Sequence, residues 1–151
     1  MDHIDSEILL LLQKNARISM SEISSIVNLS VSAVSERLKK LEQSNMIEQY
    51  TTILNPASFN KPLSVFISLE CVSSDNESLS AYIQQEKDII ECHRIAGAYE
   101  WMLKVTTTGN ASLERIINHL KSHDGVGHIR VNLITSTLKF KPSITPVSDS
   151  I

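Results

Sequence analysis

The sequence is poor in the residues that mark several large classes of protein. Its 151 residues include four glycines, four prolines, two cysteines and one tryptophan, and 5% are aromatic. Cys71 and Cys92 are too few for a disulfide framework, and since both lie in apolar strand-like runs we expect buried, reduced thiols. No apolar run approaches the roughly 20 residues of a membrane span, and Met1-Asp2-His3 is no basic signal region. We therefore expect a cytoplasmic globular protein without a membrane partner.

A strong positive charge is also lacking. The formal net charge is -3, the pI is near 5.9, and residues 1–50 hold five Lys and Arg against seven Asp and Glu. The electrostatic footprint that is typical of a nucleic-acid-binding domain is therefore missing from the chain as a whole.

Residues 19–45 predict two short helices joined by a tight turn. Ser19 and Glu22 match a capping box, in which the hydroxyl accepts from the Glu22 N–H and the carboxylate reaches back to Ser19. Only Asn28-Leu29-Ser30 separates this helix from the next periodic segment, and Ser30 is itself a favourable N-cap. Two capped helices with so short a connection predict a helix-turn-helix.

The second of these helices has two different faces when its residues are placed about 100° apart. Val34, Leu38 and Leu41 form the stripe that must be buried. The other side carries short hydroxyls and long donors, which suit contacts with phosphates and base edges. We predict DNA contacts from Ser30, Ser32, Ser35, Glu36, Arg37, Lys39, Lys40 and Gln43. The alternative is an ordinary solvated helix face. The local excess of positive charge is small, which favours an oligomer that adds several weak contacts.

The rest of the first half completes a three-helix domain and a linker. Residues 2–14 predict the first helix, so we place the DNA-binding domain at residues 1–46. Residues 46–53 alternate as a strand does, and this strand can form a wing or pair with a second copy. Asn55-Pro56 and Lys61-Pro62 break the pattern, which makes residues 47–62 a linker with a hinge.

The second half predicts the element order β-α-β-β-α-β. Strands are expected at 63–72, 89–96, 101–106 and 128–133, and helices after the 73–76 turn and from 109. This order describes a ferredoxin-like sandwich with both helices on one face of the sheet, over residues 63–141. Phe66, Val72 and Met102 on the bare face would need cover, which predicts sheet-to-sheet dimerisation. Residues 142–151 are expected to form a loose tail. The fold class is α+β, with a winged-helix-like first domain.

Several short motifs follow one another along nearly the whole chain. They are Ile4-Asp5, Asn15-Ala16-Arg17-Ile18-Ser19, Leu29-Ser30, Glu36-Arg37-Leu38-Lys39-Lys40-Leu41-Glu42, Ile47-Glu48-Gln49-Tyr50 and Ala96-Gly97 through Leu103. In this order and spacing the chain resembles the Lrp/AsnC (feast/famine) family of transcription regulators. The resemblance implies a sequence-specific, double-stranded DNA-binding regulator that forms dimers and commonly octamers, and that answers to amino acids bound between C-terminal domains.

The resemblance also implies an effector site. The family's effector loop falls on Gly97, Ala98, Tyr99, Glu100 and Trp101, with neighbouring contributions expected from Thr135, Ser136 and Thr137. Many relatives carry Asp where this chain has Ala98 and Glu100, so one carboxylate is missing and the other stands one methylene farther out. A carboxylate would bind the ammonium group of an amino acid. The alternative is a plain β-hairpin.

The sequence contains few signals for metal binding or catalysis. His119 and His123 have the i, i+4 spacing of a metal pair, but no third ligand is evident, and solvated helix polars are the favoured interpretation. No nucleophile elbow or paired carboxylates suggest catalysis, so we expect neither an enzyme nor a cofactor or metal. Two alternatives stay open. One is an architectural protein that wraps DNA, and the other is an enzyme similar to the siroheme decarboxylases, which share this layout.

Overall fold

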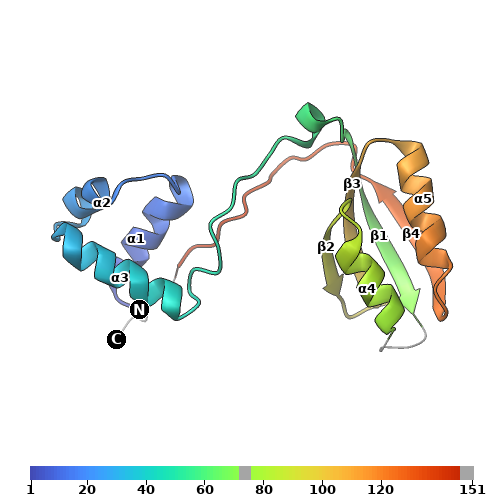
Figure 1. Ribbon diagram of the computed structural model, residues 1–151, viewed down its shortest axis with the longest axis horizontal. Coiled ribbons are helices and arrows are strands. Elements are labelled where there is room, and N and C mark those ends of the chain that lie inside the picture. Colours follow the sequence, from blue (N-terminus) through green and yellow to red (C-terminus); the bar gives the residue numbers. More distant parts are fainter. Residues whose placement is uncertain (72–75, 147–151) are drawn as a thin grey trace. The chain divides into compact units, whose positions relative to one another are not determined.

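The computed structural model describes residues 1–71 and 76–146 (Figure 1). The chain divides into two compact units. The first contains Met1–Ile53 together with the chain from Lys139 onward, and the second contains Leu54–Leu138. Each unit has its own hydrophobic core.

Three helices form the first unit: α1 (His3–Lys14), α2 (Met20–Val27) and α3 (Val31–Gln43). The capping box of α2 is present, since the Ser19 hydroxyl accepts from the Glu22 N–H at 3.2 Å and the Glu22 carboxylate accepts from the Ser19 N–H at 2.8 Å. Ser30 caps α3 by accepting from the Ala33 N–H. The three helices bury one shared core, which contains Ile8, Leu12, Ile23, Val27, Val34, Leu38 and Leu41. The predicted helix-turn-helix is confirmed.

Asparagine ends two of these helices. Asn28 after α2 and Asn45 after α3 both adopt φ of 56°, the left-handed region that Asn enters more readily than most residues. The N–H groups of Met46 and Ile47 then return to the Leu41 carbonyl, at 3.0 and 3.3 Å. These bonds close the helix end.

The predicted strand at residues 46–53 is wrong for the single chain, in which this segment is irregular. A strand needs a neighbouring ladder for its N–H and C=O groups. The described residues supply no such ladder to this segment, and two of its N–H groups are already used by α3. A 3-10 turn, η1 (Pro56–Phe59), is the regular element of the linker in the part of the chain that the structure describes.

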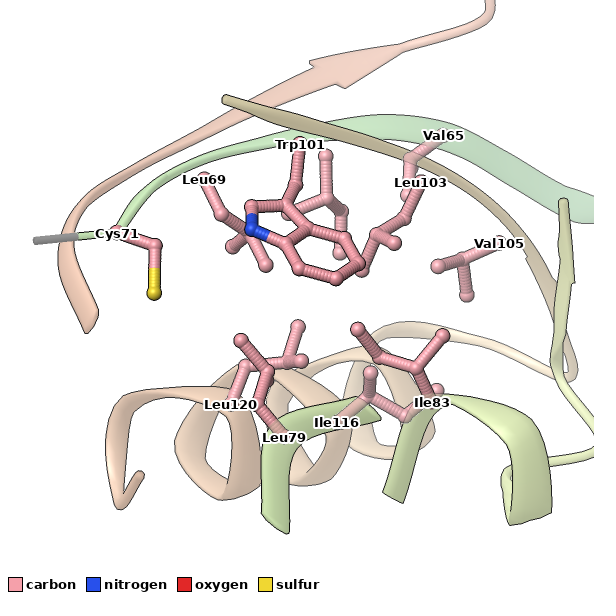
Figure 2. Packing of buried hydrophobic residues seen from close by; sticks show 11 residues of the cluster. Val65, Leu69, Cys71, Leu79, Ile83, Trp101, Leu103, Val105, Ile116 and Leu120 are labelled. Carbon is pink, nitrogen blue, oxygen red and sulfur yellow. The ribbon is translucent and has the colours of Figure 1, made fainter. Parts of the chain in front are cut away.

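The second unit is a four-stranded antiparallel sheet with two helices. Its elements are β1 (Leu63–Cys71), α4 (Glu77–Gln85), β2 (Ile89–Arg94), β3 (Trp101–Thr107), α5 (Asn110–Lys121) and β4 (Val126–Leu133), and the strand order is β2-β3-β1-β4. Figure 2 shows the helix residues Leu79, Ile83, Ile116 and Leu120 facing the sheet residues Val65, Leu69, Leu103 and Val105. The predicted βαββαβ sandwich is confirmed, while residues 72–75 of its first turn lie outside the described part.

The opposite face of the sheet is mixed rather than apolar. The strand register pairs Phe66 with Lys104 and Asn132, and Met102 with Ser68 and His93. Phe66 and Met102 therefore each lie between polar cross-strand partners, and Val72 lies outside the described residues. Both cysteines are reduced thiols, with Cys71 buried and Cys92 half-buried.

The remaining expectations concern membrane spans and the tail. Among the described residues, each helix is too short or too polar to cross a membrane. Residues 142–146 form neither helix nor strand, and residues 147–151 of the expected tail lie outside the described part.

Candidate nucleic-acid interface and effector loop

The outer face of α3 carries the polar residues that the sequence assigns to DNA contacts. Those that are exposed are Ser30, Ser32, Ser35, Glu36, Lys39, Lys40 and Gln43. The Ser30 and Ser32 hydroxyls share a hydrogen bond of 3.0 Å at the start of the helix. The N-terminus of α3 therefore presents small hydroxyl groups on its exposed side, which favours approach to a phosphate or a base edge.

The three basic residues of α3 differ in their partners. Lys40 bonds Glu36 at 2.9 Å, and this hydrogen bond lowers the pKa of the Glu36 carboxyl. Lys39 has no ion pair with any residue that the structure describes. The Lys39 ammonium is thus the cation of this face that needs no rearrangement to meet a phosphate.

Arg37 lies on the flank of α3 and points to α1. Its Nη1 donates to Asp2 Oδ2 at 2.6 Å and to Asp5 Oδ1 at 2.8 Å. These hydrogen bonds raise the pKa of the guanidinium, with that to Asp5 the larger effect. The contacts of Asp2 and Asp5 with Arg37 each span more than 30 residues and carry no local signal.

The predicted effector loop closes one end of the sheet. The Ile95 N–H donates to the Glu100 carbonyl at 2.9 Å, and the Glu100 N–H donates to the Leu69 carbonyl at 3.1 Å. The Glu100 carboxylate accepts from the Cys71 N–H at 2.9 Å. Glu100 therefore anchors the loop to the end of β1. Gly97 and Ala98 are exposed at its tip.

The two aromatic residues of this loop have different surroundings. Trp101 is 8% exposed and its ring lies in the core between sheet and helices (Figure 2). The Arg94 guanidinium lies 4.5 Å from the centre of the Trp101 ring. Tyr99 is half-buried, with the Arg130 guanidinium 5.7 Å from its ring centre. The sequence pattern gave no signal for either arginine, because each contact crosses between elements.

Thr135, Ser136 and Thr137 do not join the loop within one chain. They follow β4, whose last bond runs from the Ile134 N–H to the Ser64 carbonyl at 3.0 Å. The loop lies beyond Leu69, five residues farther along β1, and a strand advances about 3.3 Å per residue. The two groups therefore lie at opposite ends of the sheet, separated along β1 by roughly 17 Å.

The histidine pair packs against a tyrosine. The His119 ring stacks on Tyr82 with centroids 3.9 Å apart, and His123 Nδ1 lies 3.0 Å from the Ser78 hydroxyl. His119 is exposed on α5, as expected of a solvated helix residue, while His123 is half-buried in the turn after α5, and both histidines contact α4. Among the described residues, no group of three or more His, Cys, Asp or Glu side chains is placed to hold a metal ion.

Comparisons with known proteins agree with this architecture. Residues 1–48 match the family "Winged helix-turn-helix DNA-binding" and residues 64–144 match "Lrp/AsnC ligand binding domain". The regulator LrpC of Bacillus subtilis is 35% identical over 118 residues, which cover 78% of this chain and 82% of LrpC. The leucine-responsive regulatory protein of Salmonella typhimurium is 31% identical over 143 residues, which cover 92% and 87%.

Solved structures show the same fold. The L-Met complex of a Neisseria meningitidis transcriptional regulator has a TM-score of 0.89 and 28% identity, covering 95% of this chain and 96% of that one. The structure of B. subtilis LrpC has a TM-score of 0.84 and 31% identity, covering 93% and 99%. The relatives are transcription regulators rather than enzymes, which overturns the decarboxylase alternative. This chain belongs to the Lrp/AsnC family and is a DNA-binding transcription regulator.

Proposed function

We propose that this regulator recognises specific DNA sites through the outer face of α3. The observation that carries the proposal is the exposed row of Ser32, Lys39 and Gln43, in which Lys39 has no ionic partner within the described residues. Ser30, Ser35, Glu36 and Lys40 border this row and complete the contact surface. Arg37 differs from the other members of the predicted set because its guanidinium is bound to two acids at the start of α1.

A gel-shift assay on a promoter fragment tests this face. Lys39→Ala should weaken binding and lower the salt dependence by about one phosphate contact. Lys121→Ala is the matched control, because Lys121 is an exposed lysine at the end of α5 in the second unit. Equal affinity of the Lys39 variant and the control would contradict the proposed face.

The small charge of the first unit supports an oligomer. Residues 1–50 carry more acidic than basic side chains, so a single copy should bind DNA weakly. We propose a homodimer that assembles further, to an octamer, with half-sites about one helical turn apart or a multiple of it. Light scattering gives the assembly size. Footprints at that spacing would support sequence recognition, whereas uniform protection of unrelated fragments would indicate an architectural protein.

We propose an amino-acid effector that binds between two C-terminal units. The loop at Gly97–Trp101 and the residues Thr135–Thr137 lie at opposite ends of one sheet, so a site built from both needs a second copy. The solved relative is in complex with L-Met, which supports an amino acid as the ligand. Because Glu100 is bound to the Cys71 N–H, the exposed backbone of Gly97 and Ala98 is left to meet the ligand's carboxylate.

Titration calorimetry against the amino acids, beginning with L-Met, tests the effector. We expect binding heat that disappears when Gly97 is replaced by Val, because its φ of 153° and the exposed backbone suit glycine. Thr108→Val, an exposed position outside the loop, is the control. An absence of heat with every amino acid would contradict the proposal.

We also propose functional boundaries at residues 46/47, 62/63 and 141/142. The Lys61 ammonium bonds Asp88 at 2.5 Å and so ties the end of the linker to the second unit. Residues 47–54 are then the segment that should be cut first in limited proteolysis. Initial cleavage inside α3 or β1 would contradict these boundaries.

A further inference from the structure

Arg37 joins two helices through a network of four hydrogen bonds. The Asp2 and Asp5 carboxylates form the capping box of α1, in which Asp2 Oδ1 accepts from the Asp5 N–H at 2.8 Å and Asp5 Oδ2 accepts from the Asp2 N–H at 3.2 Å. Each carboxylate has one oxygen left, and both of these oxygens accept from the single Nη1 of Arg37. One atom of α3 thus bonds both acids that begin α1.

The network is partly shielded from water. The Arg37 side chain is 30% exposed and that of Asp5 is 18% exposed, while Asp2 is more open at 51%. The hydrogen bond from the Asp5 N–H and the bond from Arg37 lower the pKa of the Asp2 carboxyl, so Asp2 stays charged at neutral pH. Charge-assisted bonds of this kind, partly shielded, hold their geometry better than exposed surface pairs.

The direction of Arg37 separates it from the DNA-facing residues. Two residues along an α-helix turn the side chain by about 200°, so Arg37 and Lys39 project about 160° apart around α3. Arg37 borders the half-buried α1 side of the helix, and Lys39 is exposed on the other side. A guanidinium that reached DNA would have to give up its bonds to both carboxylates.

We propose that Arg37 is a positioning residue for DNA recognition: by holding the N-terminus of α1, it fixes the direction in which α3 presents Ser32, Lys39 and Gln43, and it does not itself contact DNA. The proposal deepens the DNA-reading function proposed above and rests on it. It assigns Asp2 and Asp5 the same role, although two acids near a DNA-binding face would otherwise be expected only to repel phosphates.

Removal of the two acids distinguishes positioning from direct contact. Asp2→Asn/Asp5→Asn keeps an acceptor at both capping positions, because Asn is also a good N-cap, but it removes the charges that hold Arg37. If Arg37 were a phosphate ligand, this double variant would bind DNA more tightly and with a steeper salt dependence. The proposal predicts the opposite, that the double variant binds DNA about tenfold more weakly. A loss of this size corresponds to one misplaced base contact.

A matched control separates this effect from net charge. Glu7→Gln/Glu48→Gln also removes two acids from the first unit, at residues that have no ion pair in the described chain. We expect this control to bind DNA as tightly as the original protein or more tightly. Circular dichroism gives the temperature at which each variant unfolds. The binding assay is run below the lowest of these temperatures.

Arg37→Ala gives the second measurement. It should weaken DNA binding while leaving the slope of log affinity against log salt unchanged, whereas Lys39→Ala should reduce that slope by about one. Arg37→Lys, which keeps a cation in reach of both acids, should restore part of the affinity. Tighter binding by the Asn double variant, or a reduced slope for Arg37→Ala, would overturn the proposal. An unchanged affinity for Lys39→Ala would instead contradict the α3 face itself, whatever the Arg37 variants do.

Discussion

The two units are stabilised by contacts of very different range. In the first, Ser19 bonds Glu22 and Ser30 bonds Ala33, so the ends of the helices are fixed by residues three positions apart. In the second, β1 pairs with β3 and β4, so that Val65 lies opposite both Val105 and Leu133. The DNA-binding unit is therefore sensitive to changes at its caps, whereas the sandwich depends on its shared core.

The largest effect is expected in that core. Leu103 is 0% exposed at the centre of β3, so Leu103→Ala should destabilise the second unit by about 2–5 kcal/mol. Trp101 is the one tryptophan of the sequence and lies in the same core, so its fluorescence in urea follows this unit alone. Leu133→Ala on β4, where Leu133 is 58% exposed, is the control. Similar losses of stability for the Leu103 and Leu133 variants would contradict this description of the core.

A smaller effect is expected at the cap of α2. Ser19→Ala removes the acceptor for the Glu22 N–H and should cost about 0.5–2 kcal/mol of the first unit's stability. Helical circular dichroism during urea unfolding measures it. Ser21→Ala, at an exposed position in the first turn of the same helix, should change little. A Ser19 variant as stable as the Ser21 variant would show that the local cap does not limit this unit.

The smallest effect is a pH dependence confined to the second unit. Burial raises the pKa of Asp88, but hydrogen bonds from Lys61 and Thr107 outweigh it and leave the pKa below the ordinary 3.8. Asp88 therefore stabilises the folded unit fully above the pKa of the unfolded chain, and this contribution is lost as pH falls through the lower folded value. Because Lys61 is partly exposed, we expect less than about 1 kcal/mol.

Urea unfolding followed by Trp101 fluorescence at pH 7 and pH 3 measures this difference. Asp88→Asn should reduce the loss of stability between these two conditions. Asp124→Asn, an exposed acid of the same unit, should leave the loss unchanged. If the Asp88 variant loses as much stability between pH 7 and pH 3 as the original protein, the role given to this carboxylate is contradicted.

Local signals explain why the fold was predictable. Helix ends depend on neighbours in the sequence, as at the capping box of Ser19, the turn at Asn28 and the helix end at Asn45. The alternation of apolar and polar residues along a strand depends only on which face of the strand is buried. The segment at 46–53 also alternates, but a strand is completed by a partner that this chain does not provide among its described residues. The pattern therefore predicted an element that the single chain does not form.

Roles within the candidate sites were less predictable, because they depend on partners distant in the sequence. Arg37 and Lys39 are both basic residues of the same predicted helix, so the sequence does not distinguish them. The partners of Arg37, Asp2 and Asp5, begin another helix. Trp101 is the last residue of the predicted effector loop, but it also begins β3, and the inward face of this strand places its ring in the core. The sequence predicted which elements carry the candidate sites, and the structure shows which side chains on them are exposed and which are bound to other residues.

Photo-crosslinking to DNA tests the central claim, that the outer face of α3 meets DNA, most directly. A photoreactive residue replaces Ser32 in one variant and Gln13, which is exposed on α1, in another. The proposed face predicts efficient crosslinks to a promoter fragment from position 32 that a competing unlabelled fragment abolishes, and weak crosslinks from position 13. Equal crosslinking from both positions, or none from position 32 in a variant that still binds DNA, would contradict it.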